Sequence, residues 1–555
     1  MINEILNNYL SKLDYNLNVI SSNRPEICDY QINDSFKLAK ELHKSPLVIG
    51  NDIVNDINEL DKYNNYFSKV ECVNGFVNLT LSDKFINDYL RTMDEKDKFN
   101  ISLEHKKIIL DYGGPNVAKP LHVGHMRTAI LGEAIKRICA YKGNETISDV
   151  HLGDYGLQIG EVIYAIIHDK KDLNDIDLDY LNEAYPRMSA LVKENDDIKE
   201  ECARITKELQ DGNSEYHKYY EVIKKVSVED IKRLYKYLDV SFDLWEGESD
   251  SYKYIPKTEE ILEKEGLLKE SNGALVVDIS KDSDSKELPP LIFKKSNGAY
   301  LYTTTDVATI YERETKYQPD NILYVVDNRQ ELHFIQVFRT IYKADISDAK
   351  LEFLGYGTVN GEDGKPYKTR KGDAPSLDSL FNEAKEIFIS KKSGNENMSD
   401  EDLRKIVNAI LKFADLQNNR VNDYIFDINK FSNVVGKTGP YMLYTVLRLD
   451  KILNSEDRKL ALSDKIYNDV DRKLRLKIIN LESAFNKAYE TRMPSYLVDY
   501  LYDLAVSAND FYQNNHIASE TDEQKKNDYL YVIYMTNRVL KEMLHLVGID
   551  IPSYM

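Results

Sequence analysis

Residues 116–125, with the sequence NVAKPLHVGH, constrain the fold of this chain more than any other segment. They follow an apolar run at residues 108–110 that is typical of a buried strand. They precede residues 126–142, whose apolar side chains recur at helical spacing. The chain therefore passes from a strand through a loop into a helix, and two histidines flank Gly124. Free N–H groups at a helix N-terminus suit a phosphate, glycine allows close approach, and imidazoles can donate hydrogen bonds to developing charge.

The rest of this region alternates strand and helix patterns from about residue 105 to residue 430. Strands are predicted at residues 108–111, 145–151, 321–326 and 351–359, with helices between them. Such alternation predicts an α/β fold, with a doubly wound, Rossmann-like parallel sheet. A charged stretch at about 165–255 is predicted to be a helical insertion into this domain.

Two further domains are predicted at the ends of the chain. Residues 1–100 indicate a small α/β domain, in which residues 70–81 alternate like two strands around a turn at Asn74-Gly75. Residues 436–555 carry helical patterns only and predict a bundle. The sheet domain is expected between them, at residues 101–435.

Composition excludes some classes of protein. No apolar run approaches the ~20 residues of a membrane span, and no export signal is recognisable at the N-terminus. Four scattered cysteines argue against a structural zinc site and for a reducing compartment, so we expect a cytoplasmic protein. The net charge of −20 disfavours nonspecific nucleic-acid binding, although a local basic surface matters more than the total.

A second glycine-rich segment, HLGDYGLQIG at residues 151–160, follows the next predicted strand. Ligands of doubly wound sheets bind at the carboxyl ends of the strands, where glycines let the backbone yield to them. A glycine-rich structural turn is the alternative interpretation.

A third cluster indicates a site for a guanidinium group. If a helix begins at Tyr302, that residue and Asp306 lie on one face, at positions i and i+4. A carboxylate beneath a phenol ring suits a guanidinium, and Asp111 could offer a second carboxylate from the opposite wall. The alternative is that Asp306 only provides charge at a helix N-terminus.

Four cations lie within seven residues at 365–371, in a loop that follows the strand predicted at 351–359. They include Lys368 and Arg370 and could hold a pyrophosphate. A solvated charged turn is the alternative. Thr358 and Val359, at the end of the strand, are expected to contact ATP.

These motifs together resemble a known family. The H-x-G-H segment is similar to the H-I-G-H signature of class I aminoacyl-tRNA synthetases. The surrounding residues, the 151–160 segment and the Tyr302–Asp306 cluster resemble bacterial arginyl-tRNA synthetases. The resemblance spans nearly the whole chain. It implies that residues 1–100 contact the tRNA elbow and that residues 436–555 bind the anticodon.

The resemblance also assigns roles to individual residues. It implies that His122, Gly124, His125 and Gly153 bind ATP, and that Asp154 and Gln158 belong to the pocket. The residues implied to bind arginine are Asp111, Asn116, His122, Tyr302, Asp306 and Gln330. His122 and His125 are the implied catalytic residues.

One motif departs from the family. The usual K-M-S-K-S loop is degenerate here, and its second lysine aligns with Thr369. The resemblance implies that Lys119, just before the histidine motif, compensates for that lysine. Which of Lys119, Lys368 and Arg370 stabilises the transferring phosphoryl group stays open.

The expected function is ligation of arginine to tRNA(Arg). The predicted partners are arginine, ATP with Mg²⁺, and tRNA, for a monomer with no protein metal site and no membrane. Another class I synthetase is one alternative, although the cysteinyl enzyme would need zinc-ligand spacing and a glutamate enzyme an arginine in its pocket. A catalytically inactive RNA-binding paralogue is a second, which the intact histidine motif disfavours.

Overall fold

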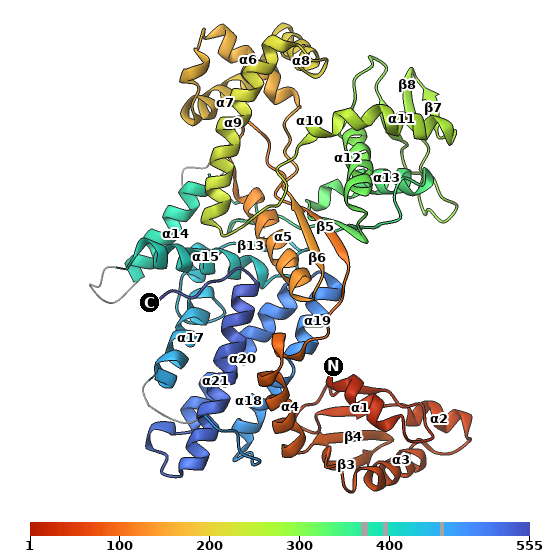
Figure 1. The fold of residues 1–555 in the computed structure, drawn as a ribbon, viewed down its shortest axis with the longest axis vertical. Coiled ribbons are helices and arrows are strands. Elements are labelled where there is room, and N and C mark those ends of the chain that lie inside the picture. The colour runs from red at the N-terminus through yellow and green to blue at the C-terminus, as the bar shows by residue number, and fades with distance from the viewer. Residues whose placement is uncertain (368–375, 392–397, 455–459) are drawn as a thin grey trace. The chain divides into compact units, whose positions relative to one another are not determined.

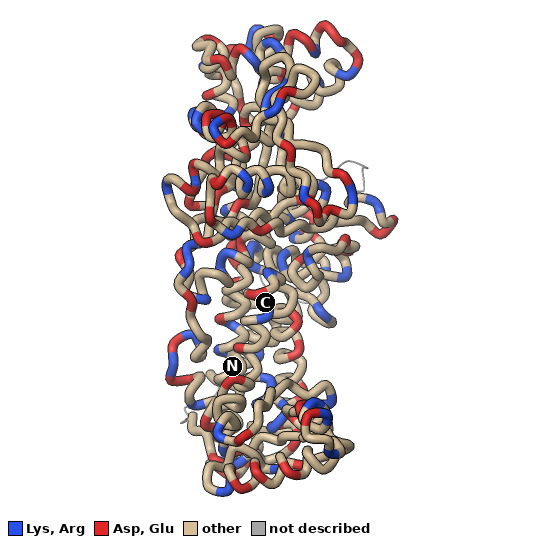
Figure 2. The backbone as a smooth tube through the Cα atoms, turned by 90° about the vertical axis from the view of Figure 1, so that its right-hand side faces the viewer, with Lys and Arg blue, Asp and Glu red and all other residues tan. Residues whose placement is uncertain are grey.

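The computed structural model describes residues 1–555 apart from 368–375, 392–397 and 455–459. The chain forms two compact units, each assembled from separated segments (Figure 1). One unit comprises Met1–Leu103, Met442–Thr491 and Tyr496–His545. The other comprises Glu104–Tyr441, Arg492–Ser495 and Leu546–Met555. Figure 2 shows basic and acidic residues interspersed along the chain, so the net charge of −20 does not come from a single acidic segment.

The predicted parallel sheet lies in the second unit. Its strands, in the spatial order β11-β10-β5-β6, are β11 (Lys350–Phe353), β10 (Asn321–Tyr324), β5 (Lys107–Asp111) and β6 (Glu145–Asp149). The chain goes from β5 to β6 on one side and later returns to β10 on the other side of β5. The strand order thus reverses between β5 and β10, where doubly wound sheets bind their ligands. The α/β fold is confirmed.

The helix after β5 begins earlier than the predicted residue 126. Helix α5 (Val123–Tyr141) starts directly after His122, whose ring accepts a hydrogen bond from the Gly124 N–H. An imidazole therefore caps the helix, which composition-based capping preferences do not anticipate.

The strand predicted at residues 351–359 was too long. Strand β11 ends at Phe353, and Val359 belongs to a separate short strand, β12 (Val359–Asn360), which pairs with β13 (Tyr424–Ile425). A Cβ added at Gly357 would lie 2.5 Å from the backbone of Asn422. The chain bends here because it must pass close to a second backbone segment.

The stretch predicted as a helical insertion is helical. Its elements are α6 (Leu157–His168), α7 (Leu178–Glu194), α8 (Asp196–Gln210), α9 (Ser214–Tyr237) and α10 (Glu248–Ser251). Helix α6 packs against α7 and α8. The remaining strands and long helices of this unit are α11 (Ile255–Lys264), β7 (Leu268–Ser271), β8 (Ala274–Val277), β9 (Leu291–Lys294), α12 (Tyr302–Tyr317), α13 (Glu331–Lys343), α14 (Leu377–Lys391), α15 (Asp400–Leu416) and α16 (Ile428–Phe431).

The first unit contains an antiparallel sheet in the order β1-β2-β4-β3. Its strands are β1 (Val19–Ser21), β2 (Tyr30–Ile32), β3 (Phe67–Val73) and β4 (Phe76–Leu81), and the predicted turn at Asn74-Gly75 joins the last two. Both turn residues have positive φ, as such a tight hairpin requires. The helices of this part are α1 (Ile2–Leu10), α2 (Ser35–Glu41), α3 (Pro46–Asp61) and α4 (Asp83–Glu95).

The predicted C-terminal helices are also present. They are α17 (Gly439–Asn454), α18 (Asp469–Ile479), α19 (Leu481–Thr491), α20 (Ser495–Asn514) and α21 (Glu523–Leu546). Helices α18 and α19 follow one another closely and are separated at Asn480, which has a ψ of 2°. Among the described residues, none of the helices has the length and apolar character needed to span a bilayer.

A buried charge cluster joins helices of the first unit that lie far apart in sequence. The Arg475 guanidinium in α18 pairs with Asp471 in the same helix and with Asp528 in α21. It also donates a 2.8 Å hydrogen bond to Asn87 in α4. All four side chains are buried. The guanidinium therefore holds the N-terminal helix α4 to the helical bundle.

Arg475→Met should destabilise this unit by about 3–5 kcal/mol, the cost of leaving buried carboxylates unpaired. Urea denaturation followed by circular dichroism measures the loss. Lys477→Met is the matched control, because Lys477 forms an exposed ion pair in the same helix. Equal midpoints for the two variants would refute a structural role for the cluster.

Candidate active site

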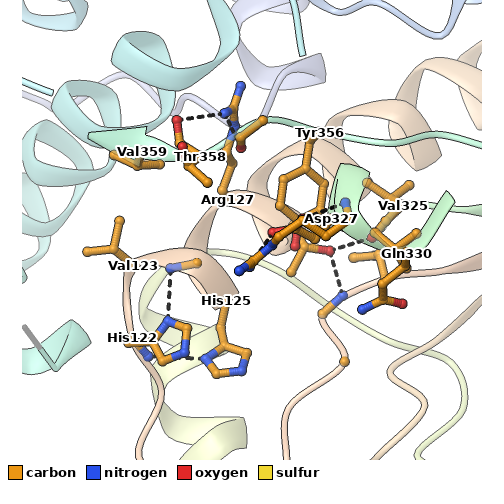
Figure 3. Close-up of a pocket in the computed structure, with 18 of the residues that line it drawn as sticks. His122, Val123, His125, Arg127, Val325, Asp327, Gln330, Tyr356, Thr358 and Val359 are labelled. Atoms are coloured by element: carbon orange, nitrogen blue, oxygen red, sulfur yellow. Dashed lines mark hydrogen bonds and ion pairs between the residues drawn. The ribbon is translucent and has the colours of Figure 1, made fainter. Parts of the chain in front are cut away.

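A cavity of about 450 Å³ opens at the reversal of strand order (Figure 3). The carboxyl ends of β5 and β10, the start of α5, and the segment between β11 and β12 supply its walls. The described residues that line it are 111–114, 116, 122–125, 127, 128, 325–327, 329, 330, 356–359, 366 and 367. The predicted site residues among them are Asp111, Asn116, His122, Gly124, His125, Gln330, Thr358 and Val359.

The two histidines of the motif lie side by side at the start of α5 (Figure 3), with ring centroids 4.0 Å apart. His122 Nδ1 accepts a hydrogen bond from Gly124 N at 3.1 Å, and His125 Nδ1 accepts one from His122 N at 3.2 Å. Because both Nδ1 atoms are acceptors, the ring proton of each neutral imidazole belongs on Nε2. Each ring therefore keeps one donor for a ligand.

Both imidazoles are held neutral. Burial, assisted by the charge of Lys119, lowers the pKa of His122. Burial, together with His122 and Lys119, lowers the pKa of His125 to about 3. At neutral pH these rings can donate hydrogen bonds to phosphate oxygens without carrying a charge.

Arg127 is a cavity residue that the sequence analysis missed. Its buried guanidinium donates to the carbonyls of Gly357, Thr358, Arg420 and Asn422, and its Nε lies 3.6 Å from a carboxylate oxygen of Asp415. It therefore fixes the backbone beside Thr358, on the wall opposite the histidines. An arginine on an otherwise apolar part of α5 was the only available signal.

Lys119 lies in the loop before α5 but is not among the described residues that line the cavity. Its Nζ sits 4.9 Å from the ring centroid of Tyr185 in α7. The preceding residue, Ala118, has a φ of 68°, and its N–H is satisfied by Ser227 Oγ of α9 at 3.0 Å. The helical insertion thus holds this strained loop in place.

Gly153 and Gln158, predicted from the 151–160 segment, contact the residues that line the cavity or one another. Gly153 pairs with Asn116, and a Cβ added to Gly153 would lie 2.5 Å from Asn116 Oδ1. Gln158 Nε2 donates to the Gly153 carbonyl at 3.2 Å. Neither Gly153 nor Gln158 lines the cavity.

Asp154 is fully buried and its carboxylate is already satisfied. It accepts hydrogen bonds from Tyr220, Lys224 and Ser249 at 2.7–2.9 Å. These residues belong to α9 and α10, so Asp154 anchors the helical insertion. This geometry offers no ligand contact for Asp154, because burial and internal bonds occupy both oxygens.

Asp111 was predicted to bind the guanidinium of a ligand. In the structure it binds the guanidinium of a residue of this chain. Arg313 Nη2 in α12 lies 2.6 Å from Asp111 Oδ2 and 2.7 Å from Asp149 Oδ2. Asp111, Asp149 and His151 have ligand atoms within 4.8 Å of one another, as a metal site would require. The Arg313 guanidinium already supplies positive charge to both carboxylates, so Asp111, Asp149 and His151 do not fit a resident metal ion.

Tyr302 and Asp306 begin α12, as predicted, and lie one turn apart. The Asp306 carboxylate faces two imidazoles, with Oδ2 at 2.5 Å from His333 Nε2 and Oδ1 at 3.7 Å from His151 Nε2. Tyr302 is 60 % exposed, and its ring packs on His333 with centroids 4.8 Å apart. Tyr302 and Asp306 do not line the cavity. Lys368 and Arg370 lie outside the described residues.

Comparison with known families matches nearly the whole chain. Residues 90–428 match the family described as "tRNA synthetases class I (R), catalytic domain". Residues 442–555 match "DALR anticodon binding domain", and residues 1–81 match "Arginyl tRNA synthetase N terminal domain".

Individual proteins agree with these family matches. The arginine–tRNA ligase of Alkaliphilus oremlandii is 41% identical over 569 residues, covering 97% of this chain and 95% of the relative. That of Agathobacter rectalis is 38% identical over 574 residues, covering 97% and 96%. The arginyl-tRNA synthetase structure from Thermus thermophilus superposes with a TM-score of 0.82 at 23% identity, covering 100% of this chain and 99% of the other. The arginyl-tRNA synthetase structure from Plasmodium falciparum superposes with a TM-score of 0.81 at 24% sequence identity, covering 100% of this chain and 98% of the other.

Arg127→Lys should weaken ATP binding about tenfold, because a lysine ammonium cannot reach carbonyls on both sides of the guanidinium fork. Isothermal titration with ATP measures the effect. Arg137→Lys is the matched control in the same helix, remote from the cavity. If the two variants bind ATP equally well, Arg127 does not organise the ATP site.

Proposed function

This chain belongs to the arginyl-tRNA synthetase family, and from that premise we propose how its residues divide the reaction. It is an arginine–tRNA ligase, which activates arginine with ATP and transfers it to the 3′-terminal adenosine of tRNA(Arg). One observation carries the proposal: two neutral imidazoles, each with its ring proton on Nε2, line a cavity where the strand order of the sheet reverses.

The first step is attack by the arginine carboxylate on the α-phosphorus of ATP. An O–P bond forms, the bond to the β-phosphate breaks, and pyrophosphate leaves. We assign the Nε2 donors of His122 and His125 to the phosphate oxygens whose charge grows in this step. The α5 N-terminus and Gly124 supply N–H groups and room beside them. Thr358 and Val359, fixed by Arg127, are assigned to the nucleoside part of ATP.

Arginine is assigned to the other half of the crevice. Asn116 and Gln330 line the cavity and would hold the α-amino and carboxylate groups. Asp306, one turn after Tyr302 on α12, would bind the guanidinium through charge-assisted hydrogen bonds, with Tyr302 and Asp111 as further candidate contacts. The protein then acts by orientation and electrostatics, because the reaction needs no covalent enzyme intermediate.

Cations complete the phosphate site. We propose that Mg²⁺ arrives with the ATP phosphates as part of the substrate, since Arg313 occupies the carboxylate group that resembles a metal site. Our candidates for stabilising the leaving pyrophosphate are Lys119, Lys368 and Arg370. Of these, Lys119 lies closest to the histidines in sequence and lowers the pKa of both.

The second step transfers arginine to tRNA. A ribose hydroxyl of the terminal adenosine attacks the arginyl carbonyl carbon, and AMP leaves. We propose that residues 436–555 read the anticodon and that residues 1–100 contact the tRNA elbow, in line with the families that these parts match. A monomer that works in the cytoplasm stays a prediction.

His122→Ala and His125→Ala should each lower kcat for arginyl-adenylate formation by roughly 10²–10³-fold, the usual effect of losing a preorganised donor. ATP–pyrophosphate exchange with tRNA present measures this step. His168→Ala is the control, because that ring is exposed at the end of α6. Near wild-type turnover in both motif variants would contradict the phosphate-site assignment.

Asp306→Asn should lower kcat/KM for arginine, because the guanidinium loses a charged partner. The loss should correspond to about 2–4 kcal/mol of transition-state stabilisation. The dissociation constant for ATP should not change. Aminoacylation at varied arginine concentration tests this, with the exposed Asp348→Asn as the control. Equal losses in arginine use and ATP binding would indicate a folding defect and remove the assignment.

A further inference from the structure

The carboxylate assigned to the substrate guanidinium already has an internal partner. His333 Nε2 lies 2.5 Å from Asp306 Oδ2, and the Tyr302 ring covers the imidazole. His333 Nδ1 is buried and has no hydrogen-bond partner among the described residues. Among the described residues, the His333 ring thus makes one hydrogen bond, from Nε2 to the Asp306 carboxylate, which is the group assigned to the substrate guanidinium.

The charges around Asp306 are otherwise set by the protein. Burial opposes charge on His151, but its interactions with Asp149 and Asp111 raise its pKa to about 10, so it is cationic at neutral pH. Burial would also raise the pKa of Asp149, yet His151 and Arg313 together lower it. Arg313 is cationic and bridges Asp111 and Asp149.

This cluster has three carboxylates and only two permanent cations. Arg313 pairs with Asp111 and Asp149, and His151 lies 3.7 Å from a carboxylate oxygen of both Asp149 and Asp306, which leaves the three carboxylates one positive charge short. A proton on His333 can balance it, and so can a substrate guanidinium. Both together would place two cations against one carboxylate, which repel each other strongly away from water.

We propose that His333 is a positioning residue that acts through Asp306: it holds the carboxylate in the absence of arginine, and its protonated form competes with the arginine side chain. Arginine binding then expels one proton from the pair. The cavity stops short of Asp306 in this structure, as expected where the imidazole takes the place of the guanidinium. The proposal rests on the assignment of Asp306 to arginine.

Other titratable groups also face this pair. They are Tyr302 and Arg313 on α12, Glu248 on α10, Tyr324 at the end of β10, and His151 just after β6, which in turn contacts Asp149 and Asp111. Glu248 is the one that could imitate the effect. Its burial, opposed by His151 and assisted by Asp154 and Asp306, raises its pKa to about 7. If Glu248 rather than His333 set the pH dependence of arginine binding, Glu248→Gln would lose that dependence and His333→Gln would keep it.

The test is calorimetric titration of the full-length protein with arginine between pH 6 and 8, in two buffers of different ionisation heat. His333→Gln is the main variant, because its amide nitrogen can replace Nε2 but cannot take up a proton. For wild type, the dissociation constant should rise as pH falls, by at most tenfold per pH unit for one proton. The buffer comparison should show release of up to one proton per arginine. In His333→Gln both effects should disappear.

Two controls separate the alternatives. Glu248→Gln and His168→Gln should each keep the wild-type pH dependence. The proposal is overturned if His333→Gln keeps that dependence, if Glu248→Gln loses it, or if wild type releases no proton. The last outcome does not depend on any variant folding.

Failure of the underlying assignment has a different signature. If Asp306→Asn binds arginine as tightly as wild type at pH 8, Asp306 is not the guanidinium ligand. If Asp306→Asn binds arginine weakly and His333→Gln keeps the wild-type pH dependence, only the role of His333 is refuted.

Discussion

The guanidinium of Arg313 organises the carboxyl ends of the parallel strands. Asp149, Asp111 and Tyr324 are the last residues of three adjacent strands, and they stand in register across the sheet. Arg313, from α12, pairs with both carboxylates and donates a 3.2 Å hydrogen bond to the Tyr324 hydroxyl. One side chain therefore fixes the strand ends where the crevice opens. Without it, two buried carboxylates would lose the guanidinium that pairs with both of them.

That arrangement divides the crevice into two electrostatic environments. At the proposed phosphate end, burial lowers the pKa values of His122 and His125. In the proposed assignment, these neutral rings stabilise negative charge that grows on ATP without first binding anions tightly. At the proposed amino-acid end, the Asp306 carboxylate lies against the imidazoles of His333 and His151. Arginine, with a permanent planar cation, suits such a site better than a neutral side chain does. In the proposed assignment, specificity and catalysis thus rely on different chemistry.

The predicted strands and helices were mostly correct because each depends on local periodicity. Strand β5, helix α12 and the turn at Asn74-Gly75 were recognisable from neighbouring residues alone. Errors arose where distant segments set the local conformation. Beyond strand β11, Gly357 passes against the backbone of Asn422, and no residue near Phe353 encodes that contact.

By itself, the sequence determined the order of strands and helices, the position of the histidine motif at a helix N-terminus, and the resemblance to one synthetase family. It also identified residues that line the cavity, such as Asn116 and Gln330. Only the tertiary structure showed that Asp154 anchors an insertion, that Arg127 fixes the wall beside Thr358, and that His333 and Arg313 occupy the predicted guanidinium ligands. The physical reason is that a side chain's type limits its chemistry, whereas its partner depends on which distant residue the fold brings within about 3 Å.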